Sequence, residues 1–398
     1  MIFNKNMTLL QIKNRNYFIK WYSYMSTLLI ALNVTQLRSV ASIFMYAIII
    51  ITPLVTLFLY STDQKRSVTL LPYAFLLIAC ISLIVNKVNL LFRPVERLIL
   101  FSSLFVGFGP CLQSSKINDL RYLIVINTLK LFVVITLFSF ISYLTKMPFA
   151  FGDAGFKGVT PHSMDLSPVS GLASLYIISL LNHQQQSKHK IYLSIFLICS
   201  IITMFISASR GAILGFGIST LFMLFNTLSS VKKFIKVVFV LIFVIVSLVV
   251  INPFSMMDGL NEKSERTELQ DDYTGGRKIS LEKRFIEFKE NPIFGVGFSS
   301  MKYTNPTPSG HFEPGSGWVF ILSSTGLLGI LISLLMCIKS LLNGRLSSNT
   351  VLFASIILFF MIHSIIEGYI ITVSNSFCIY MWMVVGLAYE KKYLRKYA

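Results

Sequence analysis

The chain has 398 residues, of which 54% are apolar and 13% charged, and its mean hydropathy is +0.71. In a soluble domain about a quarter of the residues are usually charged, so the composition excludes that class. Long apolar runs recur along nearly the whole sequence, and many could cross ~30 Å of hydrocarbon as helices. Because lipid cannot satisfy backbone polar groups, these spans are expected to be helical. The composition therefore predicts an all-α fold, a polytopic transmembrane helical bundle.

The apolar runs predict about twelve spans in a single integral membrane domain that covers the whole chain, 1–398. In chain order, the expected spans are 18–34, 40–60, 69–86, 97–113, 122–144, 165–182, 190–207, 211–227, 234–252, 317–338, 350–371 and 375–389. The basic N-terminus is not followed by a small-residue cleavage site, so no cleavable signal peptide is expected.

Lysine and arginine residues set the expected orientation. With both termini in the cytoplasm, the cytoplasmic segments hold nineteen of these residues and the short outer loops hold seven. The positive-inside rule therefore places both termini in the cytoplasm. The outer loop around residues 87–97 is an exception to the positive-inside rule, because it carries Lys87, Arg93 and Arg97.

The net charge of +18 does not indicate nucleic-acid binding. The long loop 253–316, between the ninth and tenth expected spans, holds eight basic and ten acidic residues. The remaining positive charge is dispersed over loop ends that face lipid headgroups, so nucleic acid is not an expected partner. The five cysteines all fall inside expected spans, which indicates neither disulfides nor a clustered metal motif.

The loop 253–316 is expected to be a periplasmic insert that is partly folded, and loops of this length are usually functional. Within it, "GRKISLEKRFIEFKENP" predicts an amphipathic helix that ends at Asn291–Pro292. Its apolar side would be formed by Ile279, Leu281, Phe285, Ile286 and Phe288. Arg266 and Arg284 are expected to be surface charges.

Two arginines are candidates for binding phosphate. Arg210, in "ISASRGAILGFG", lies between two spans joined by almost no loop, and an arginine at that depth is costly unless it pairs or faces a wet cavity. Arg277 follows two glycines and begins the amphipathic helix, where the helix N-terminus favours anions. A guanidinium also recognises phosphate bidentately. The alternatives are a snorkelling side chain at 210 and an ordinary solvated charge at 277.

A histidine and a glutamate stand just before the tenth span, in "SGHFEPGSGW". A neutral His311 or an ionised Glu313 could act as the general base towards a sugar hydroxyl. The alternative is a solvated histidine in a flexible loop. His162, in the second outer loop, is a further candidate. His363 and Glu367 lie one turn apart near the outer end of the eleventh span, where Glu367 could orient an outer-face arginine.

Three patches of sequence resemble the O-antigen polymerase and O-antigen ligase superfamily of bacterial membrane glycosyltransferases. They are "SASRG" between two spans, "GGR" followed fourteen residues later by "NPIFGVGF", and the loop histidine ahead of "STGLLG". The resemblance covers roughly residues 150–375. It implies a C-type glycosyltransferase-like fold with one large periplasmic loop.

The resemblance implies a multi-pass enzyme of the bacterial inner (cytoplasmic) membrane that needs no metal or other cofactor. It would transfer a glycan from undecaprenyl diphosphate to a growing glycan acceptor at the periplasmic face. Arg210 and Arg277 would bind the diphosphate, and the loop histidine would assist the acceptor. Flippase and chain-length regulator proteins would be candidate partners.

One departure from the ligase pattern favours a polymerase of O-antigen, exopolysaccharide or capsule. Ligases resemble one another in a histidine that precedes a small polar residue and lies closer to the "GLLG" glycine. Here His311 precedes Phe312 and lies fifteen residues before Gly326. A ligase that transfers glycan to lipid A core, in lipopolysaccharide biosynthesis, stays the alternative.

Metal-dependent membrane glycosyltransferases resemble one another in an acidic pair in the first outer loop. That loop here is "TQLRS", which has no carboxylate, and Asp271–Asp272 is interpreted as a surface pair.

A lipid-linked oligosaccharide flippase or other transporter is the competing class, because it would also be polytopic and basic. Transporters often carry internal repeats with broken helices at matching positions, and hydropathy shows no clear repeat here. A noncatalytic assembly subunit is a third class. Gene neighbourhood would discriminate, since sugar-nucleotide enzymes favour a polymerase and a lipid A core cluster favours a ligase.

The first prediction concerns orientation. A cysteine substituted at Ser264 in the loop 253–316 should react with an impermeant thiol reagent in intact spheroplasts. A cysteine at Ser348, in an expected cytoplasmic loop, should react only after lysis. The opposite labelling pattern would invert the orientation and remove the argument for an outer-face site.

Overall fold

The computed structural model describes residues 9–88, 92–152, 155–183, 186–228, 277–304, 314–345 and 349–397, and the single residues 230, 232, 235 and 347. This part of the chain is mostly helical. Its main helices are α1 (Leu9–Asn33), α2 (Arg38–Ser61), α3 (Leu70–Val85), α4 (Pro94–Gly107), α5 (Ser115–Leu144), α6 (Ser163–His183), α7 (Ser187–Ile206), α8 (Arg210–Thr227), α11 (Lys278–Glu290), α12 (Gly317–Gly344), α13 (Val351–Ile366), α14 (Ser376–Ala388) and the short α15 (Lys391–Leu394).

Eleven of the twelve expected spans coincide with helices, and the ninth, 234–252, lies almost entirely outside the described residues. Among the described residues, five helices are long and apolar enough to cross a membrane, namely Arg38–Ser61, Ser115–Leu144, Ser163–Asn182, Ser187–Ile206 and Gly317–Gly344. Shorter apolar helices are α3, α13 and α14. The chain is therefore a helical membrane protein.

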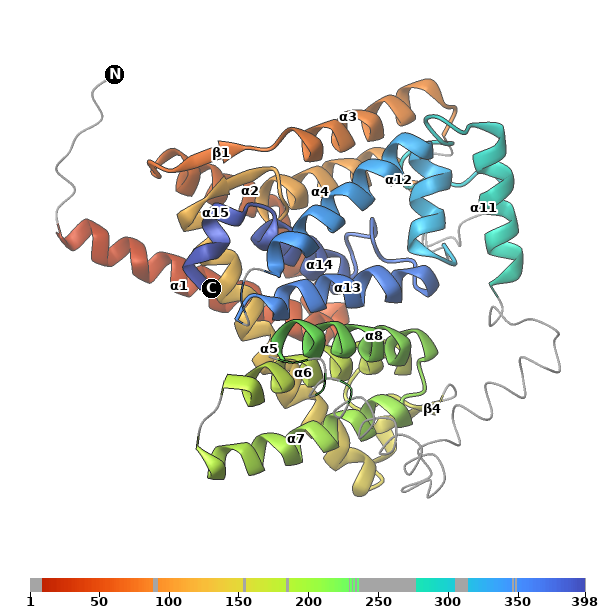
Figure 1. The fold of residues 1–398 in the computed structure, drawn as a ribbon. Coiled ribbons are helices and arrows are strands. Elements are labelled where there is room, and N and C mark those ends of the chain that lie inside the picture. Colours follow the sequence, from red (N-terminus) through yellow and green to blue (C-terminus); the bar gives the residue numbers. More distant parts are fainter. Residues whose placement is uncertain are drawn as a thin grey trace.

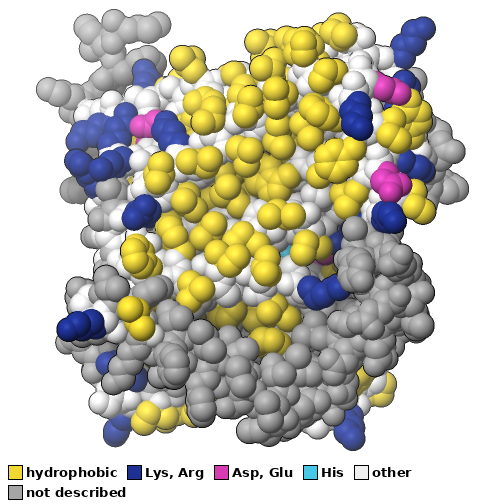
Figure 2. All heavy atoms as spheres, turned by 45° about the vertical axis from the view of Figure 1, so that its right-hand side comes forward, with side chains coloured by type: hydrophobic (Ala, Val, Ile, Leu, Met, Phe, Trp, Pro, Cys, Tyr) yellow, Lys and Arg dark blue, Asp and Glu magenta, His cyan; other side chains and the backbone are white. Residues whose placement is uncertain are grey.

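The helices lie side by side, so the molecule has two ends (Figure 1). One end carries α15 and the C-terminus, and the other carries α11. Apolar side chains cover much of the middle of one face, with lysines and arginines gathered towards its edges (Figure 2). This pattern is typical of a helical bundle whose apolar middle faces lipid and whose ends face water.

Helix α14 is the centre of the bundle, since every residue from Ser376 to Ala388 is buried. A helix that is apolar on all sides is expected at such a place. Its Trp382 indole donates to the Ile370 carbonyl at 2.8 Å, and the Tyr380 hydroxyl donates to the Val125 carbonyl of α5 at 3.1 Å. The polar tips of these large aromatic side chains are thus satisfied inside the core.

The fourth expected span, 97–113, is too long by its last six residues. Helix α4 ends at Gly107, and Leu112–Ser114 form a strand, β2, that pairs antiparallel with β1 (Arg66–Val68). Pro110 cannot continue a helix, which explains the break. A second short pair, β3 (Phe151–Gly152) and β4 (Gly155–Phe156), is the other exception to the all-α prediction among the described residues.

Arg121, which directly precedes the fifth expected span, is one of the nineteen basic residues assigned to cytoplasmic segments from the sequence, but its side chain is buried. Its guanidinium donates to the carbonyls of Phe108 and Leu112, both at 2.9 Å, and to that of Gly109. These carbonyls follow the last helical residue of α4: Phe108 is its C-cap residue, Gly109 lies just beyond it, and Leu112 begins β2. The arginine therefore holds the turn that leads from α4 into β2.

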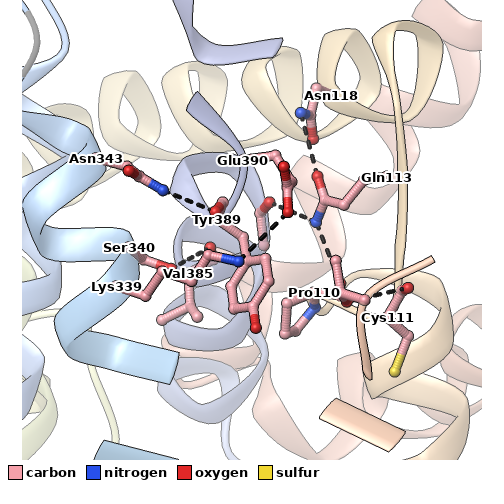
Figure 3. A network of polar contacts seen from close by, with 12 residues as sticks. Pro110, Cys111, Gln113, Asn118, Lys339, Ser340, Asn343, Val385, Tyr389 and Glu390 are labelled. Atoms are coloured by element: carbon pink, nitrogen blue, oxygen red, sulfur yellow. Dashed lines mark hydrogen bonds and ion pairs between the residues drawn. The ribbon is translucent and has the colours of Figure 1, made fainter. Parts of the chain in front are cut away.

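Polar side chains next to this turn join α14 and α12 at the same end of the bundle (Figure 3). Gln113 donates to the carbonyls of Pro110 (3.2 Å) and Gly386 (3.0 Å). On the α12 side, Asn343 donates to the Tyr389 carbonyl at 2.8 Å and Lys339 pairs with Glu390 at 3.3 Å. This end of the bundle is thus held by a hydrogen-bonded network.

Helix α12 is broken at Gly326, whose φ of 69° and ψ of −168° are not helical. The segment 291–298, "NPIFGVGF", lies against this break. The amide of Val296 donates to the Ser323 carbonyl, and that of Leu327 to the Pro292 carbonyl, both at 2.8 Å. Two of the sequence patches are therefore bonded to each other through their backbones.

Only glycine fits at position 326. A Cβ there would lie 2.1 Å from the Ile293 carbonyl oxygen and 2.6 Å from the Phe294 amide nitrogen. Gly295 has the same role across the contact, because its Cβ would lie 2.5 Å from the Ser323 carbonyl oxygen. The backbones can approach closely because neither residue has a side chain.

We expect Gly326→Ala to destabilise the protein by about 2–4 kcal/mol. The added Cβ would clash with the backbone of the neighbouring segment, and the left-handed φ is unfavourable for alanine. Gly217→Ala in α8 is the matched control, because a Cβ there would meet nothing within 4 Å. That change should be neutral or slightly stabilising. Thermal unfolding of both purified variants in detergent measures the difference, and equal melting temperatures would contradict the packing described here.

Candidate active site

A cavity of about 820 Å³ lies at the end of the bundle that carries α11. Its charged lining residues are Arg93, Glu96, Arg97, Arg277 and Glu367. Thr372, Ser374 and Asn375, from the loop before α14, add uncharged polar groups to the wall. A concave site with a few convergent polar and charged groups is the usual form of a small-molecule site.

Arg277 and Glu367, two of the residues singled out from the sequence, form an ion pair in this wall. Arg277 Nη2 lies 2.9 Å from Glu367 Oε1, and Arg277 Nη1 donates to the Ile366 carbonyl at 2.7 Å. Both side chains are largely buried, at 11% and 19% exposure. Arg277 is therefore not an ordinary solvated charge.

The end of α13 explains how this pair forms. The eleventh span was expected to run to 371 with Glu367 inside it, but the helix ends at Ile366 and Glu367 is its extended C-cap residue. The backbone therefore turns at Glu367. The guanidinium of Arg277 lies at the C-terminus of α13, where the helix dipole favours a positive charge.

Arg210 is the first residue of α8 and is exposed. It is not among the residues that line the cavity. The next residue, Gly211, packs against α13, because a Cβ there would lie 3.1 Å from Ile366 and 3.3 Å from His363. Since Arg277 binds the Ile366 carbonyl, the structure brings both candidate arginines to the C-terminal end of α13.

His162 is exposed and precedes α6, where its carbonyl accepts the backbone amide of Asp165 at 3.0 Å. The Asp165 carboxylate is 15% exposed and lies 3.8 Å from Arg38. It is also within electrostatic range of His162 and Glu367. Asp165 was not singled out from the sequence, although a carboxylate in the first turn of an expected span is an unusual residue there.

His311 and Glu313 lie outside the described residues, as do Arg266, Asp271 and Asp272. The chain after Glu313 is described from Pro314, which lines the cavity with Gly315. The amide of Gly317 then donates to the Glu367 carbonyl at 3.1 Å. In the part of the chain that the structure describes, no group of three His, Cys, Asp or Glu residues could hold a metal ion.

Arg284 was expected to be a surface charge, and that prediction is wrong. Its side chain is 1% exposed and lies 2.7 Å from the Glu287 carboxylate, which is fully buried. Glu287 also accepts the backbone amides of Lys302 (2.6 Å) and Tyr303 (3.2 Å). The pair fixes α11 to the segment that follows the glycine turn. The sequence pattern did not indicate this ion pair, because Arg284 and Glu287 lie among solvated charged residues of the same helix.

Each of the two buried charges compensates part of the cost of burying the other. Burial raises the pKa of the Glu287 carboxyl and lowers the pKa of the Arg284 guanidinium to about 10, and their mutual attraction counters both shifts. A buried pair of this kind depends on both partners, because removing one leaves an uncompensated charge.

We expect Arg284→Met and Glu287→Leu each to lower the stability by about 3–5 kcal/mol, and the double variant by less than the sum. The exposed pair of Lys302 with Glu290, the last residue of α11, at 2.6 Å is the control. Lys302→Met should cost less than about 1 kcal/mol. Denaturant unfolding of the four variants gives the coupling energy, and additive single and double changes would show that the buried charges do not interact.

Comparison with known proteins supports the resemblance seen in the sequence. Residues 195–334 match a protein-family model described as O-antigen ligase. No curated protein matches the chain. The matched range contains Arg210, Arg277, the segment 291–298 and the break in α12. The family covers O-antigen ligases and polymerases, glycosyltransferase-like enzymes whose substrate is a lipid-linked glycan in a membrane. The match over residues 195–334 thus supports the relation of this membrane protein to the O-antigen polymerase and ligase superfamily.

Proposed function

We propose that the protein polymerises undecaprenyl-diphosphate-linked oligosaccharide repeat units at the periplasmic face of the bacterial inner membrane. The observation that carries the proposal is the position of Arg277. Helix α11 and the end of α13 hold this arginine in the wall of a cavity at one end of the bundle. A lipid-linked donor fits such a place, since its tail can stay in the bilayer while its diphosphate and sugars reach the aqueous end.

The reaction needs stabilisation of a leaving diphosphate. The acceptor hydroxyl oxygen forms a bond to the anomeric carbon of the donor sugar, and the bond from that carbon to the diphosphate oxygen breaks. Negative charge then grows on the diphosphate while a base takes the proton of the hydroxyl. Preorganised arginines stabilise that charge without a metal ion. Arg277, in the cavity wall, and Arg210, exposed at the start of α8, are assigned this role.

The side chain of Glu367 sets the orientation of Arg277. A carboxylate 2.9 Å from one guanidinium nitrogen fixes the plane of the group before the substrate arrives. His311 and Glu313 are the candidates for the base, because the chain that follows them enters the cavity wall at Pro314. His162 is assigned a supporting role from the neighbouring outer loop.

Two alternatives remain distinct from this proposal. A ligase that transfers the glycan to lipid A core would use the same donor chemistry with another acceptor. A flippase would be expected to carry a charged cavity near the middle of the bundle. The charged cavity here is lined by the first turn of α4, the start of α11 and the end of α13, which favours transfer at one face.

If Arg210 clamps the diphosphate bidentately, Arg210→Lys should fail nearly as badly as Arg210→Ala, because lysine lacks the planar fork. The loss should be on the order of 2–4 kcal/mol, or about thirty- to a thousandfold in rate. Arg277→Lys should be milder if the start of α11 shares the phosphate. Turnover of a lipid-diphosphate glycan by purified protein measures this, and activity should persist in excess chelator.

The same assay separates the two candidate bases. His311→Ala should lower turnover and leave donor-lipid binding intact, since the base acts after the donor is seated. If Glu313→Gln abolishes turnover and His311→Ala does not, the glutamate is the base. Normal turnover and binding in all these variants at equal protein levels would sink the glycosyltransferase proposal and favour the transporter.

A further inference from the structure

His363, an ionisable residue inside an expected span, has no role in the proposed reaction. Its side chain is buried near the end of α13, at 1% exposure. The ring nitrogen Nδ1 shares a hydrogen bond with the Tyr369 hydroxyl at 2.9 Å, whereas Nε2 is buried and has no hydrogen-bond partner among the described residues. A buried polar atom without a partner costs free energy, so packing alone does not explain a histidine at this position.

The partner of His363 is a tyrosine in the wall of the candidate active site. Tyr369 lines the cavity, although it is only 4% exposed. Its ring packs against Phe360 of α13 and Phe377 of α14, with ring centroids 5.9 and 5.7 Å apart. In such apolar surroundings a hydrogen bond is electrostatically stronger than in water. The bond therefore ties the chain that follows α13 back to that helix.

The turn between His363 and Tyr369 contains the groups that hold Arg277. The Ile366 carbonyl accepts from Arg277 at 2.7 Å, and the Glu367 carboxylate pairs with the same guanidinium at 2.9 Å. The Glu367 amide donates to the His363 carbonyl at 2.9 Å, and the Tyr369 hydroxyl bonds to the imidazole. His363 thus holds this turn with one backbone and one side-chain hydrogen bond.

The same turn receives the chain that follows the two candidate bases. The Gly317 amide donates to the Glu367 carbonyl at 3.1 Å. Pro314 lies so close to Gly368 that a Cβ at that glycine would be 2.0 Å from the proline ring. Gly317 is the first residue of α12, so its amide has no partner within that helix. The entering chain therefore depends on this turn for its position.

We propose that His363 is a positioning residue, which acts through Tyr369 on the turn between them. The hydrogen bond between these two side chains fixes the place of Glu367, and Glu367 in turn sets the orientation of the Arg277 guanidinium. His363 itself takes no part in bond making or in proton transfer. This inference rests on the proposed function and adds to it a group that lies behind the cavity wall.

Variants that separate the two ring nitrogens test this role. An asparagine amide reaches the place of Nδ1 and a glutamine amide the place of Nε2, so His363→Asn keeps the bond to Tyr369 and His363→Gln loses it. Tyr369→Phe and His363→Gln should each lower kcat for glycan transfer about ten- to a hundredfold, with KM for the lipid-diphosphate donor nearly unchanged. His363→Asn should retain most of the turnover. The reverse order, with glutamine active and asparagine inactive, would assign the role to Nε2 and overturn the proposal.

Tyr380→Phe is the matched control, because it removes a buried hydroxyl that donates to the Val125 carbonyl at 3.1 Å, outside the cavity lining. It should lose similar stability and keep its turnover. Coupling to the ion pair is tested in a Glu367→Gln background, where Tyr369→Phe should have little further effect on kcat, since both changes release the same guanidinium. Independent effects of the two changes would show that Tyr369 does not act through Glu367.

Hydrogen exchange of the full chain in detergent reports on the turn without the reaction. The Gly317 amide should exchange at least about tenfold faster in Tyr369→Phe and His363→Gln than in the wild type and in Tyr380→Phe, because its acceptor is no longer fixed. Unchanged exchange would overturn the proposal whether or not the protein transfers glycan. Faster exchange in a protein whose wild type transfers no glycan would refute the proposed reaction and leave the positioning role of His363 standing.

Discussion

The arrangement of the candidate site depends on one backbone contact, the docking of residues 291–298 into the break of α12. Gly295 and Gly326 allow the backbones of the two segments to approach more closely than they could if either residue had a side chain. The same segment reaches the neighbouring helices. Asn86 at the end of α3 donates to the Gly295 carbonyl at 2.8 Å, and Phe298 packs against Phe101 of α4. Irregular backbone at this depth is tolerated because protein rather than lipid surrounds it.

This contact relates the elements that build the cavity. Helix α11 precedes the docked segment and presents Arg277, while α4 lies beside it and presents Arg93 and Arg97. The buried pair of Arg284 and Glu287 then fixes α11 to the chain that follows the docked segment. A rigid frame of this kind lets three arginines keep their places although they repel one another.

Guanidinium groups bound to helix-end carbonyls occur at both ends of the bundle, with different consequences. Arg121 binds the carbonyl of Phe108, the C-cap residue of α4, and that of Leu112 in β2, and it is fully enclosed, so it stabilises the turn between them. Arg277 binds the carbonyl at the end of α13 and borders a cavity, so it can also meet a ligand. The contact of a guanidinium with backbone carbonyls is thus structural at Arg121, whereas at Arg277 the same kind of contact leaves the guanidinium at the edge of a cavity that an anion could enter. The match of residues 195–334 to the O-antigen ligase family model is the reason for proposing a lipid-linked diphosphate as that anion.

The sequence by itself determined the helical membrane class and the places of the helices, because long apolar runs have few alternatives in lipid. It also singled out Arg277, through its position at the start of an amphipathic segment, and the superfamily, through short motifs around glycines. Tertiary structure decided what those motifs do. That the segment around Gly295 packs against the break at Gly326, that Glu367 leaves α13 to reach Arg277, and that Arg284 is buried all depend on contacts between segments far apart in the chain. Local periodicity carries no information about such contacts. The sequence suggested that Glu367 could orient an arginine, but only the packing of the helices decided which arginine it meets.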